Sequence, residues 1–215
     1  MKRLITLCAA VACAAPLVAA QARPQTAQSD PDRPQRGGGT LPAGWKARLD
    51  SGATAITGVN FTLMGSAFHF ITGPAGIYYK PDSQGTGVYA VQATFTQVKP
   101  SEHPEAYGLF IGGSNLDGPR QQYTYFLLRQ DGRFLVKRRI GASTPTIADW
   151  TADAAVKTGK MVNLLAIEVG RDKVRFLVNG KEVSSTDRAR VDAEGIAGLR
   201  INHNLDLMVE NFSVK

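Results

Sequence analysis

Pairs of carboxylates are the first residues in this chain that could do chemistry. Retaining glycoside hydrolysis requires two carboxyl groups about 5 Å apart, and a β-strand presents such a pair at positions i and i+2, which project from the same face. The nearest pair is Glu102 and Glu105, which are three positions apart and flank His103 and Pro104. A polar, proline-containing segment of this kind favours a solvated surface loop. If the protein is an enzyme, this loop is where we expect its catalytic groups.

Metal-ligating side chains are sparse. The chain has three histidines, His69, His103 and His203, and none has a second histidine or a carboxylate at a metal-binding interval. A zinc site needs three or four converging ligands. We therefore expect no zinc site and no cofactor.

Aromatic and cationic side chains point to binding instead of catalysis. Sugar rings stack on exposed aromatic faces and accept hydrogen bonds from arginine, asparagine and glutamine. We expect Tyr125 opposite Arg138 at the centre of such a surface, and Trp150, in the polar segment 143–153, as an exposed loop aromatic. The alternative is that most of these residues pack in the core or at a sheet edge. The candidate ligand-binding residues are Tyr107, Phe110, Tyr125, Arg129, Arg138 and Trp150, with Tyr123 beside them.

The elements that must position these residues are β-strands. After residue 41 the chain has almost no helical apolar spacing, but many short runs rich in Val, Ile, Tyr, Phe and Thr, separated by Gly, Pro, Asn and Asp. So many short strands predict an all-β fold, a two-sheet antiparallel β-sandwich. The expected strands are residues 45–49, 68–72, 76–79, 89–97, 107–111, 123–130, 133–140, 163–169, 173–178, 181–184, 196–201 and 207–214.

Two glycine-containing turns predict how neighbouring strands pair. The Asn-Gly sequence at 179–180 tolerates positive φ at both positions, which predicts a two-residue type I′ hairpin. The Asp-Gly sequence at 131–132, treated as a second two-residue turn, places Tyr125 opposite Arg138. Both faces of this second strand pair are partly apolar, which indicates a core on one side and a shallow concavity on the other.

The N-terminal segment predicts export. A charged start, an apolar stretch and a small-residue cleavage pattern make residues 1–22 a signal peptide, too short for a transmembrane helix. Residues 23–40, rich in Gln, Pro, Arg and Gly, predict a disordered linker. Residues 41–215 are long enough for a single sandwich domain with its own core. We therefore expect a periplasmic or extracellular protein.

Cysteine positions and net charge narrow the function further. Cys8 and Cys13 both lie in the leader, so we expect no disulfide, thiolate metal site or cysteine nucleophile in the mature chain. Residues 10–13 loosely resemble a lipoprotein signal, which leaves a lipid anchor at Cys13 as an alternative. The net charge of +7 falls by the two charges of Lys2 and Arg3 to +5. Without basic runs, this charge favours anionic cell-surface polymers over nucleic acid.

The C-terminal half resembles a known superfamily. Residues 163–183 read NLLAIEVGRDKVRFLVNGKEV, residues 195–202 read GIAGLRIN, and residues 207–214 read LMVENFSV. This order of strands and turns resembles the concanavalin A-like lectin and glucanase sandwiches. It is most similar to the laminin-G-like and exo-inulinase-like jelly rolls, which include the 3-keto-disaccharide hydrolase domain. The resemblance covers most of residues 41–215 and implies a jelly-roll sandwich.

The catalytic patterns of that superfamily are missing here. Members of the 3-keto-disaccharide hydrolase type carry an acidic pair and an arginine on two concave strands, where this chain reads AYGLFIG at 106–112 and QYTYFLL at 122–128. Laminarinase-like members carry E-x-D-x-E on one strand, and the nearest candidate, Glu168, stands alone. The resemblance also implies a structural calcium ion in some members, for which Asp50 or Asp206 is available, although no segment resembles an EF-hand loop.

Three hypotheses for the function remain open. The first is an exported, non-catalytic glycan-binding or adhesion module that uses the concave sheet. The second is a hydrolase or lyase acting on a 3-keto-disaccharide or glycoside, which requires two carboxylates in one pocket. The third is a structural envelope protein whose sandwich binds another protein. A fold of this kind does not by itself name the function.

Overall fold

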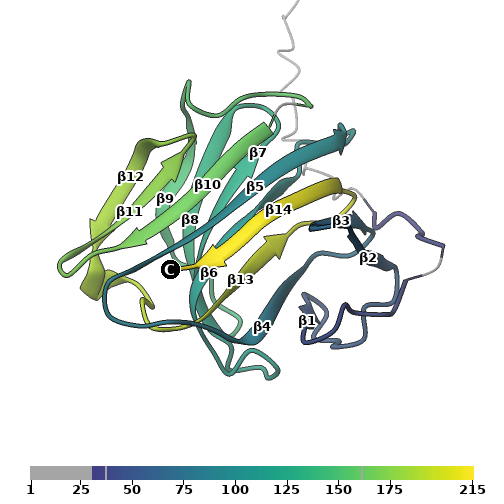
Figure 1. Ribbon diagram of the computed structural model, residues 1–215, viewed down its shortest axis with the longest axis horizontal. Coiled ribbons are helices and arrows are strands. Elements are labelled where there is room, and N and C mark those ends of the chain that lie inside the picture. The colour runs from purple at the N-terminus through teal and green to yellow at the C-terminus, as the bar shows by residue number, and fades with distance from the viewer. Residues whose placement is uncertain (1–30, 37, 161) are drawn as a thin grey trace, which may run out of the picture. The chain divides into compact units, whose positions relative to one another are not determined.

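Two antiparallel β-sheets stack face to face in the computed structural model, which describes residues 31–36, 38–160 and 162–215 (Figure 1). The strands are β1 (Lys46–Leu49), β2 (Val59–Met64), β3 (Ala67–Thr72), β4 (Gly76–Gly85), β5 (Tyr89–Lys99), β6 (Ala106–Ser114), β7 (Gln122–Arg129), β8 (Arg133–Ile140), β9 (Thr146–Ala152), β10 (Val162–Val169), β11 (Lys173–Val178), β12 (Lys181–Asp187), β13 (Gly195–Ile201) and β14 (Asp206–Val214), with one 3-10 turn, η1 (Arg188–Arg190). The predicted all-β sandwich is confirmed.

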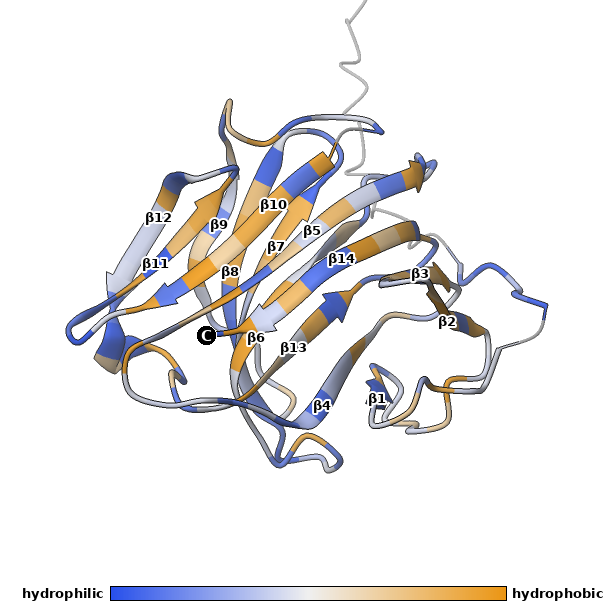
Figure 2. Ribbon diagram, viewed as in Figure 1, coloured by the Kyte–Doolittle hydropathy of each residue, from blue (hydrophilic) through white to orange (hydrophobic). Residues whose placement is uncertain are grey.

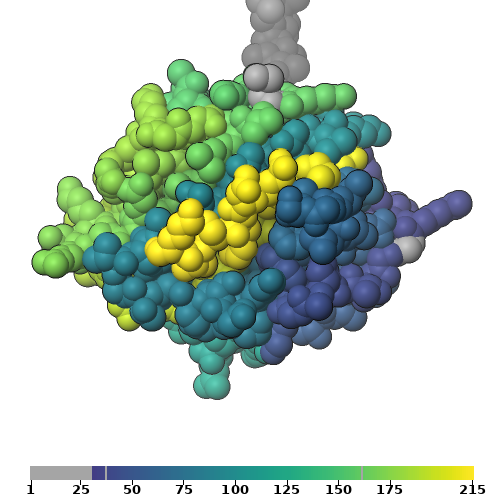
Figure 3. Space-filling view, viewed as in Figure 1, coloured from purple at the N-terminus to yellow at the C-terminus, as the bar shows by residue number. Residues whose placement is uncertain are grey.

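Each sheet has seven strands. The β7 sheet has the order β1-β4-β13-β6-β7-β8-β9, and the β10 sheet has the order β12-β11-β10-β5-β14-β3-β2. Figure 1 looks onto the β10 sheet, with β6, β7 and β8 behind it. In the space-filling view, β14 (yellow) runs across this face between β3 and β5 (Figure 3). The last residue, Lys215, exchanges two backbone hydrogen bonds of 2.8 and 2.9 Å with Ala90 of β5.

The core lies between the sheets because successive residues of a strand point to opposite faces. Buried and more exposed residues accordingly alternate along β5 and β10, and the middle of β10 is mostly hydrophobic (orange) in Figure 2. Phe126 of β7 meets Phe176 of β11 across the interior with ring centroids 5.4 Å apart, and both side chains are fully buried. Each large apolar side chain buried in this way contributes roughly 1.5–3 kcal/mol.

The hairpin between β11 and β12 is the predicted type I′ turn. Val178 pairs with Lys181, and the two residues between them, Asn179 and Gly180, have φ of 51° and 81°. The Asn179 side chain also accepts a hydrogen bond of 2.9 Å from the backbone N–H of Leu164. The turn residue therefore ties its hairpin to the neighbouring strand β10.

The hairpin between β7 and β8 differs from the prediction by one residue. It closes on Arg129 and Arg133, so its loop has three residues instead of two. Gly132 occupies the left-handed position of this loop, with φ of 86°, and its N–H donates to the Arg129 carbonyl at 3.1 Å. Three-residue loops with a glycine at this position are a common alternative to the type I′ turn. Because the longer loop shifts the pairing of β7 with β8 by one residue, Tyr125 lies opposite Lys137 and not opposite Arg138.

Two strands were not predicted, and both lie at sheet edges. β2 and β9 end the β10 and β7 sheets respectively, and most of their residues are half-buried or exposed. Edge strands lack the continuous apolar pattern of central strands, which is why the sequence pattern missed them. Trp150 therefore belongs to β9 and not to a loop.

The segment before β1 contacts one end of the sandwich. The Arg33 N–H donates to the Asn204 side-chain oxygen at 2.7 Å, and the Asn204 side-chain nitrogen donates to the Pro31 carbonyl at 3.0 Å. His203 lies between Asp32 and Glu105, at 3.3 and 2.7 Å. Residues 31–36 and 38–40, the end of the predicted linker, are thus part of the described unit.

Several expectations fall outside the described residues. The predicted signal peptide, its two cysteines and residues 23–30 of the predicted linker are among them. In the described part of the chain, no helix has the length and apolar character needed to cross a membrane.

Candidate functional site

The outer face of the β7 sheet carries a second apolar layer. Leu128 of β7 lies in the sandwich interior, and Leu127 points outward, yet Leu127 is only 3% exposed. The buried outward-facing layer consists of Ile77, Tyr79, Ala106, Phe110, Leu116, Tyr123, Tyr125, Leu127 and Leu135, with Trp150 and Ile196 packed against it. Burial on the side away from the core indicates a hollowed face whose side chains cover one another.

Aromatic rings form a continuous row on this outer face. Phe110 of β6 lies 5.2 Å from Tyr123, and Tyr123 lies 5.6 Å from Tyr125, measured between ring centroids. Trp150 of β9 lies near the edge of the row, with the guanidinium carbon of Arg129 4.4 Å from its ring centroid. Arginine at this distance over an indole makes a cation–π contact. The row therefore places positive charge beside aromatic rings, of which Trp150 is half-buried and the other three are buried.

Three arginines converge on the same face, and we call Arg48, Arg139 and Arg200 the arginine cluster. Strand register places Arg48 and Arg200 in one row on either side of Ile77. Arg200 donates two hydrogen bonds to the carboxylate of Asp50, of 2.6 and 2.7 Å. This two-point pairing is the geometry for which the planar guanidinium is suited.

Arginines from three strands act on the carboxyl group of Asp50. Burial acts to raise the pKa of the Asp50 carboxyl, yet the positive charges of Arg200, Arg139 and Arg48 hold it below its ordinary value. Asp50 follows β1, whereas Arg139 is on β8, five strands away in the sheet. The charges that lower the pKa of Asp50 therefore come from β1, β13 and β8, which are distant from one another in the chain.

The tyrosines of this face remain protonated at neutral pH. Burial raises the pKa of Tyr123 and Tyr125 above the ordinary phenol value, and the positive charge of Arg200 only partly opposes it. A neutral phenol donates and accepts hydrogen bonds, but it is not a general base near pH 7. These groups are suited to binding hydroxyls and ring faces.

Four of the predicted ligand-binding residues lie together on the outer face. Phe110, Tyr125, Arg129 and Trp150 belong to the aromatic row or contact it. Phe110 is fully buried beneath its neighbours, and Tyr125 is 8% exposed. Phe110 therefore supports the face from below, Tyr125 shows only a small part of its side chain, and the half-buried Trp150 reaches the surface.

The other two predicted residues lie elsewhere. Tyr107 points into the core, where its ring lies 5.2 Å from that of Phe95 and its side chain is 2% exposed. Arg138 pairs with Asp192 through two hydrogen bonds of 2.6 and 2.7 Å. The expected pairing of Tyr125 with Arg138 is wrong, because the three-residue hairpin loop places Arg138 opposite Thr124.

The carboxylates of the predicted catalytic loop do not converge. Glu102 is exposed and pairs with Arg33 at 3.3 Å. Glu105 is largely buried and contacts His203 at 2.7 Å. Each carboxylate is therefore held by its own partner at the end of the sandwich that contacts residues 31–36, and the loop shows no paired-acid geometry.

The two aspartates considered for calcium are both occupied by protein partners. Asp50 is held by Arg200, and Asp206 contacts His69 at 2.8 Å. Within the described residues, the search for three or more His, Cys, Asp or Glu side chains grouped as metal ligands found none. The donor set at either aspartate therefore does not fit a calcium ion, which prefers six to eight oxygen ligands.

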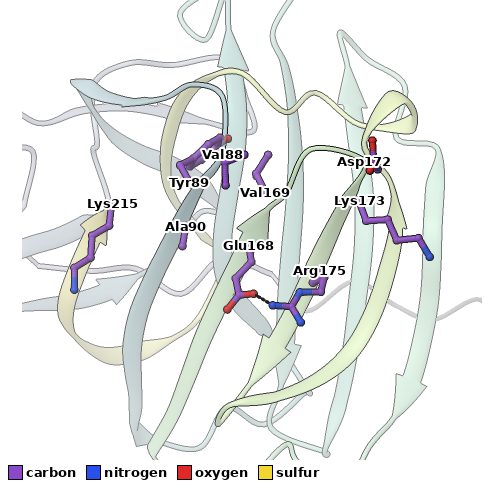
Figure 4. A pocket seen from close by; sticks show the side chains of 10 residues that line it. Val88, Tyr89, Ala90, Glu168, Val169, Asp172, Lys173, Arg175 and Lys215 are labelled. Atoms are coloured by element: carbon purple, nitrogen blue, oxygen red, sulfur yellow. Dashed lines mark hydrogen bonds and ion pairs between the residues drawn. The ribbon is translucent and has the colours of Figure 1, made fainter.

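A groove lies on the opposite side of the molecule, on the outer face of the β10 sheet. It has a volume of about 660 Å³, and its lining includes the charged residues Glu168, Asp172, Lys173, Arg175 and Lys215 (Figure 4). Glu168 enters it but forms an ion pair with Arg175, which also lies 3.6 Å from Glu182. This carboxylate, which the sequence singled out, is thus neutralised by its neighbour.

The sequence reasoning missed the arginine cluster and Asp50 as a binding partner. Their joint position depends on pairing between β1, β13 and β8, which are distant in the chain. A partial signal was present in the segment GLRI, residues 198–201, where an arginine alternates with buried Leu199 and Ile201 in a strand. A lone arginine in a central strand indicates a polar partner on its face.

Comparison with known proteins identifies the fold. No family model and no curated protein matches the chain. Among solved structures, the carbohydrate-binding module CBM66 from Bacillus subtilis is similar with a TM-score of 0.60 at 11% identity, over 80% of this chain and 95% of that one. The fold is a concanavalin A-like jelly roll.

Other jelly rolls with different roles are similar to comparable degrees. An alginate lyase of polysaccharide lyase family 7 has a TM-score of 0.54 at 13% identity, covering 80% of this chain and 93% of the lyase. The carbohydrate recognition domain of Emp46p has a TM-score of 0.52 at 10% identity, covering 80% and 88%. At these identities the likeness extends to the jelly roll and not to its site residues.

Proposed function

We propose that this protein is an exported, non-catalytic glycan-binding module that holds its ligand on the outer face of the β7 sheet. The observation that carries the proposal is the aromatic row beside the arginine cluster on the same outer face. Tyr125 and Trp150 provide ring faces for stacking, and Arg129, Arg139 and Arg200 surround them with hydrogen-bond donors. Saccharide sites combine these two kinds of group.

The roles of similar jelly rolls are compatible with this proposal. CBM66 is named a carbohydrate-binding module, and the Emp46p domain is named a carbohydrate recognition domain. An alginate lyase of the same fold shows that the jelly roll also hosts catalysis, so the choice depends on the site.

The carboxylates of this chain favour binding over glycoside hydrolysis. Asp50, at the rim of the face, is engaged by two hydrogen bonds from Arg200. The sequence candidates Glu102, Glu105 and Glu168 lie on other surfaces, each with its own cationic or histidine partner. Hydrolysis by a pair of carboxyl groups needs both at one bond.

A glycan array with matched variants tests the proposal. The wild type should bind at least one saccharide class, and both Tyr125→Ala and Trp150→Ala should reduce that binding about tenfold, since loss of one stacked aromatic removes roughly 1–2 kcal/mol. Leu164→Ala, an exposed position of the β10 sheet, is the control and should bind like the wild type.

Two results would overturn the proposal. One is that the folded wild type binds no glycan, or that folded Tyr125→Ala and Trp150→Ala proteins bind with unchanged affinity. The other is steady turnover of 3-keto-glycosides or plain disaccharides by the wild type, which would make the protein an enzyme. Circular dichroism of each variant establishes that loss of binding is not loss of folding.

A further inference from the structure

We infer that the glycan is acidic, and that a carboxylate on its sugar ring binds between Arg48 and Arg139. This inference rests on the proposed glycan-binding function and specifies its ligand class. It starts from an imbalance of charge on the outer face of the β7 sheet.

The arginine cluster holds three positive charges and shares one carboxylate. Asp50 is taken up by Arg200 in a two-point ion pair. Arg48 makes a hydrogen bond of 3.3 Å to the Leu49 carbonyl, which carries no full charge. The Nε atoms of Arg48 and Arg139 are both buried without a hydrogen-bond acceptor in the described part of the chain. The centre of the face therefore has a surplus of two positive charges.

The other half-buried arginines in the described part of the chain each pair with a carboxylate. Arg129 pairs with Asp131, Arg138 with Asp192, and Arg188 with Glu194. Arg48 and Arg139, which have no carboxylate partner among the described residues, therefore both lie at the candidate site.

Burial makes the imbalance costly in the unbound protein. Arg48 is 9% exposed, and a guanidinium removed from water is stable only when charge or hydrogen bonds compensate it. Groups held in such an unfavourable state cluster at functional sites. An incoming carboxylate would supply the missing acceptors, because its two oxygens match the planar fork of arginine.

The neighbouring aromatic row argues for a sugar-borne carboxylate over a free anion. Arg139 lies directly opposite Tyr123 in the pairing of β7 with β8, and Arg48 and Arg139 both act electrostatically on Tyr123, so the arginines left without a carboxylate in the described structure lie beside the aromatic row. A uronic acid presents a carboxylate and a flat ring face on one unit. Inorganic phosphate or sulfate would use the guanidiniums alone.

A pair of ligands that differ only in charge tests the inference. Isothermal titration would compare oligogalacturonate tetrasaccharide with the same oligosaccharide after reduction of its carboxyl groups to alcohols. We expect the acidic form to bind about tenfold or more tightly, the scale of a charge-assisted hydrogen bond, and its affinity to fall as NaCl rises. A parallel titration with oligomannuronate covers a second uronate geometry.

Variants of the arginine cluster identify the groups that recognise the charge. Arg139→Gln should lower the affinity for the acidic form about tenfold and leave the reduced form unchanged, and Arg48→Gln should do the same. Arg190→Gln, an exposed residue of η1, is the matched control and should leave both affinities unchanged. If Arg48→Gln fails to fold, the affinities of Arg139→Gln for the acidic and reduced forms decide the result, because Arg139 is only half-buried.

The outcomes separate this inference from the proposed function. Equal binding of the acidic and reduced oligosaccharides, or preference for neutral glycans, would overturn the acidic ligand and keep the glycan-binding module. Phosphate or sulfate that binds as tightly as the uronates, with the same loss in Arg139→Gln, would also overturn it. Absence of binding to any glycan, acidic or neutral, would overturn both.

Discussion

Arg200 of β13 and Asp50, 150 positions earlier in the chain, form a two-point ion pair at the rim of the outer face of the β7 sheet. The Arg200 side chain is 12% exposed and the Asp50 side chain 46%. The pair joins the segment after β1 to a strand two places away in the sheet. It therefore has a structural role as well as a place beside the candidate site.

The Asp50→Asn substitution should make the free energy of unfolding less dependent on pH in the acidic range. The pKa of Asp50 is lowered from 3.8 by folding, so its contribution is complete above about pH 4 and is lost as the pH falls through the lower folded value. At pH 7 we expect the variant to lose about 1–2 kcal/mol of unfolding free energy, a modest figure because Asp50 is partly exposed.

Urea unfolding at pH 7 and at pH 3 measures this effect. The difference in unfolding free energy between the wild type and Asp50→Asn should be smaller at pH 3 than at pH 7. Asp172→Asn, at an exposed position, provides the control and should match the wild type at both pH values. A gap of the same size at both pH values would contradict the assignment of the pKa to this ion pair.

The Gly198→Ala substitution should disturb the floor of the candidate site. A methyl group at Gly198 would lie 2.6 Å from the Cε1 atom of Phe110 and 2.5 Å from the Tyr78 carbonyl oxygen. Overpacking of this kind costs about 1–3 kcal/mol. We expect a lower melting temperature and an altered near-ultraviolet circular dichroism signal, because Phe110 packs against the tyrosines. Gly118→Ala, where the nearest atom is 3.8 Å away, should change neither.

Trp150 should report ligand binding by fluorescence. The chain has two tryptophans: Trp45 is 6% exposed among Phe61 and Phe68, whereas Trp150 lies at the candidate site beneath Arg129. We expect a change in emission on glycan binding that persists in Trp45→Phe and disappears in Trp150→Phe. A signal that follows Trp45 instead would place the ligand away from the aromatic row.

Asn204 should control how firmly residues 31–36 are held. Its side chain bonds both to the Arg33 N–H and to the Pro31 carbonyl, and its own φ is 56°. Trypsin should cleave after Arg36 faster in Asn204→Gly, which keeps the backbone conformation but loses both bonds. Asn115→Gly, at another residue with positive φ, should leave the cleavage rate unchanged. Equal rates in all proteins would show that other contacts hold the segment.

The sequence allowed the sandwich and most central strands to be predicted because their patterns are local. The Asn179-Gly180 turn encodes its own hairpin, since both residues favour positive φ. The Asp131-Gly132 turn is ambiguous, because a glycine with positive φ suits both two-residue and three-residue loops. That single-residue ambiguity moved Arg138 away from Tyr125, since the side-chain period of a strand is two.

The candidate site was predicted only in part because it is built from distant segments. Tyr125 and Arg129 come from β7 and Trp150 from β9, and their types alone suggested binding. Asp50 and Arg200 meet only after β1, β4 and β13 pair, and no local pattern encodes that order. Nor does a local pattern reveal that Tyr107 faces the core, because both faces of β6 and β7 are apolar.

The backbone pairing of Lys215 with Ala90 has a practical consequence for assay design. It holds Lys215 on the β10 sheet, whereas the arginine cluster lies on the far side of the β7 sheet. Attachment to a biosensor chip or bead through a tag placed after Lys215 would thus leave the candidate site, on the opposite surface, accessible to ligand. Coupling through random surface lysines would lack this orientation, because Lys137 faces Tyr125 at the candidate site itself.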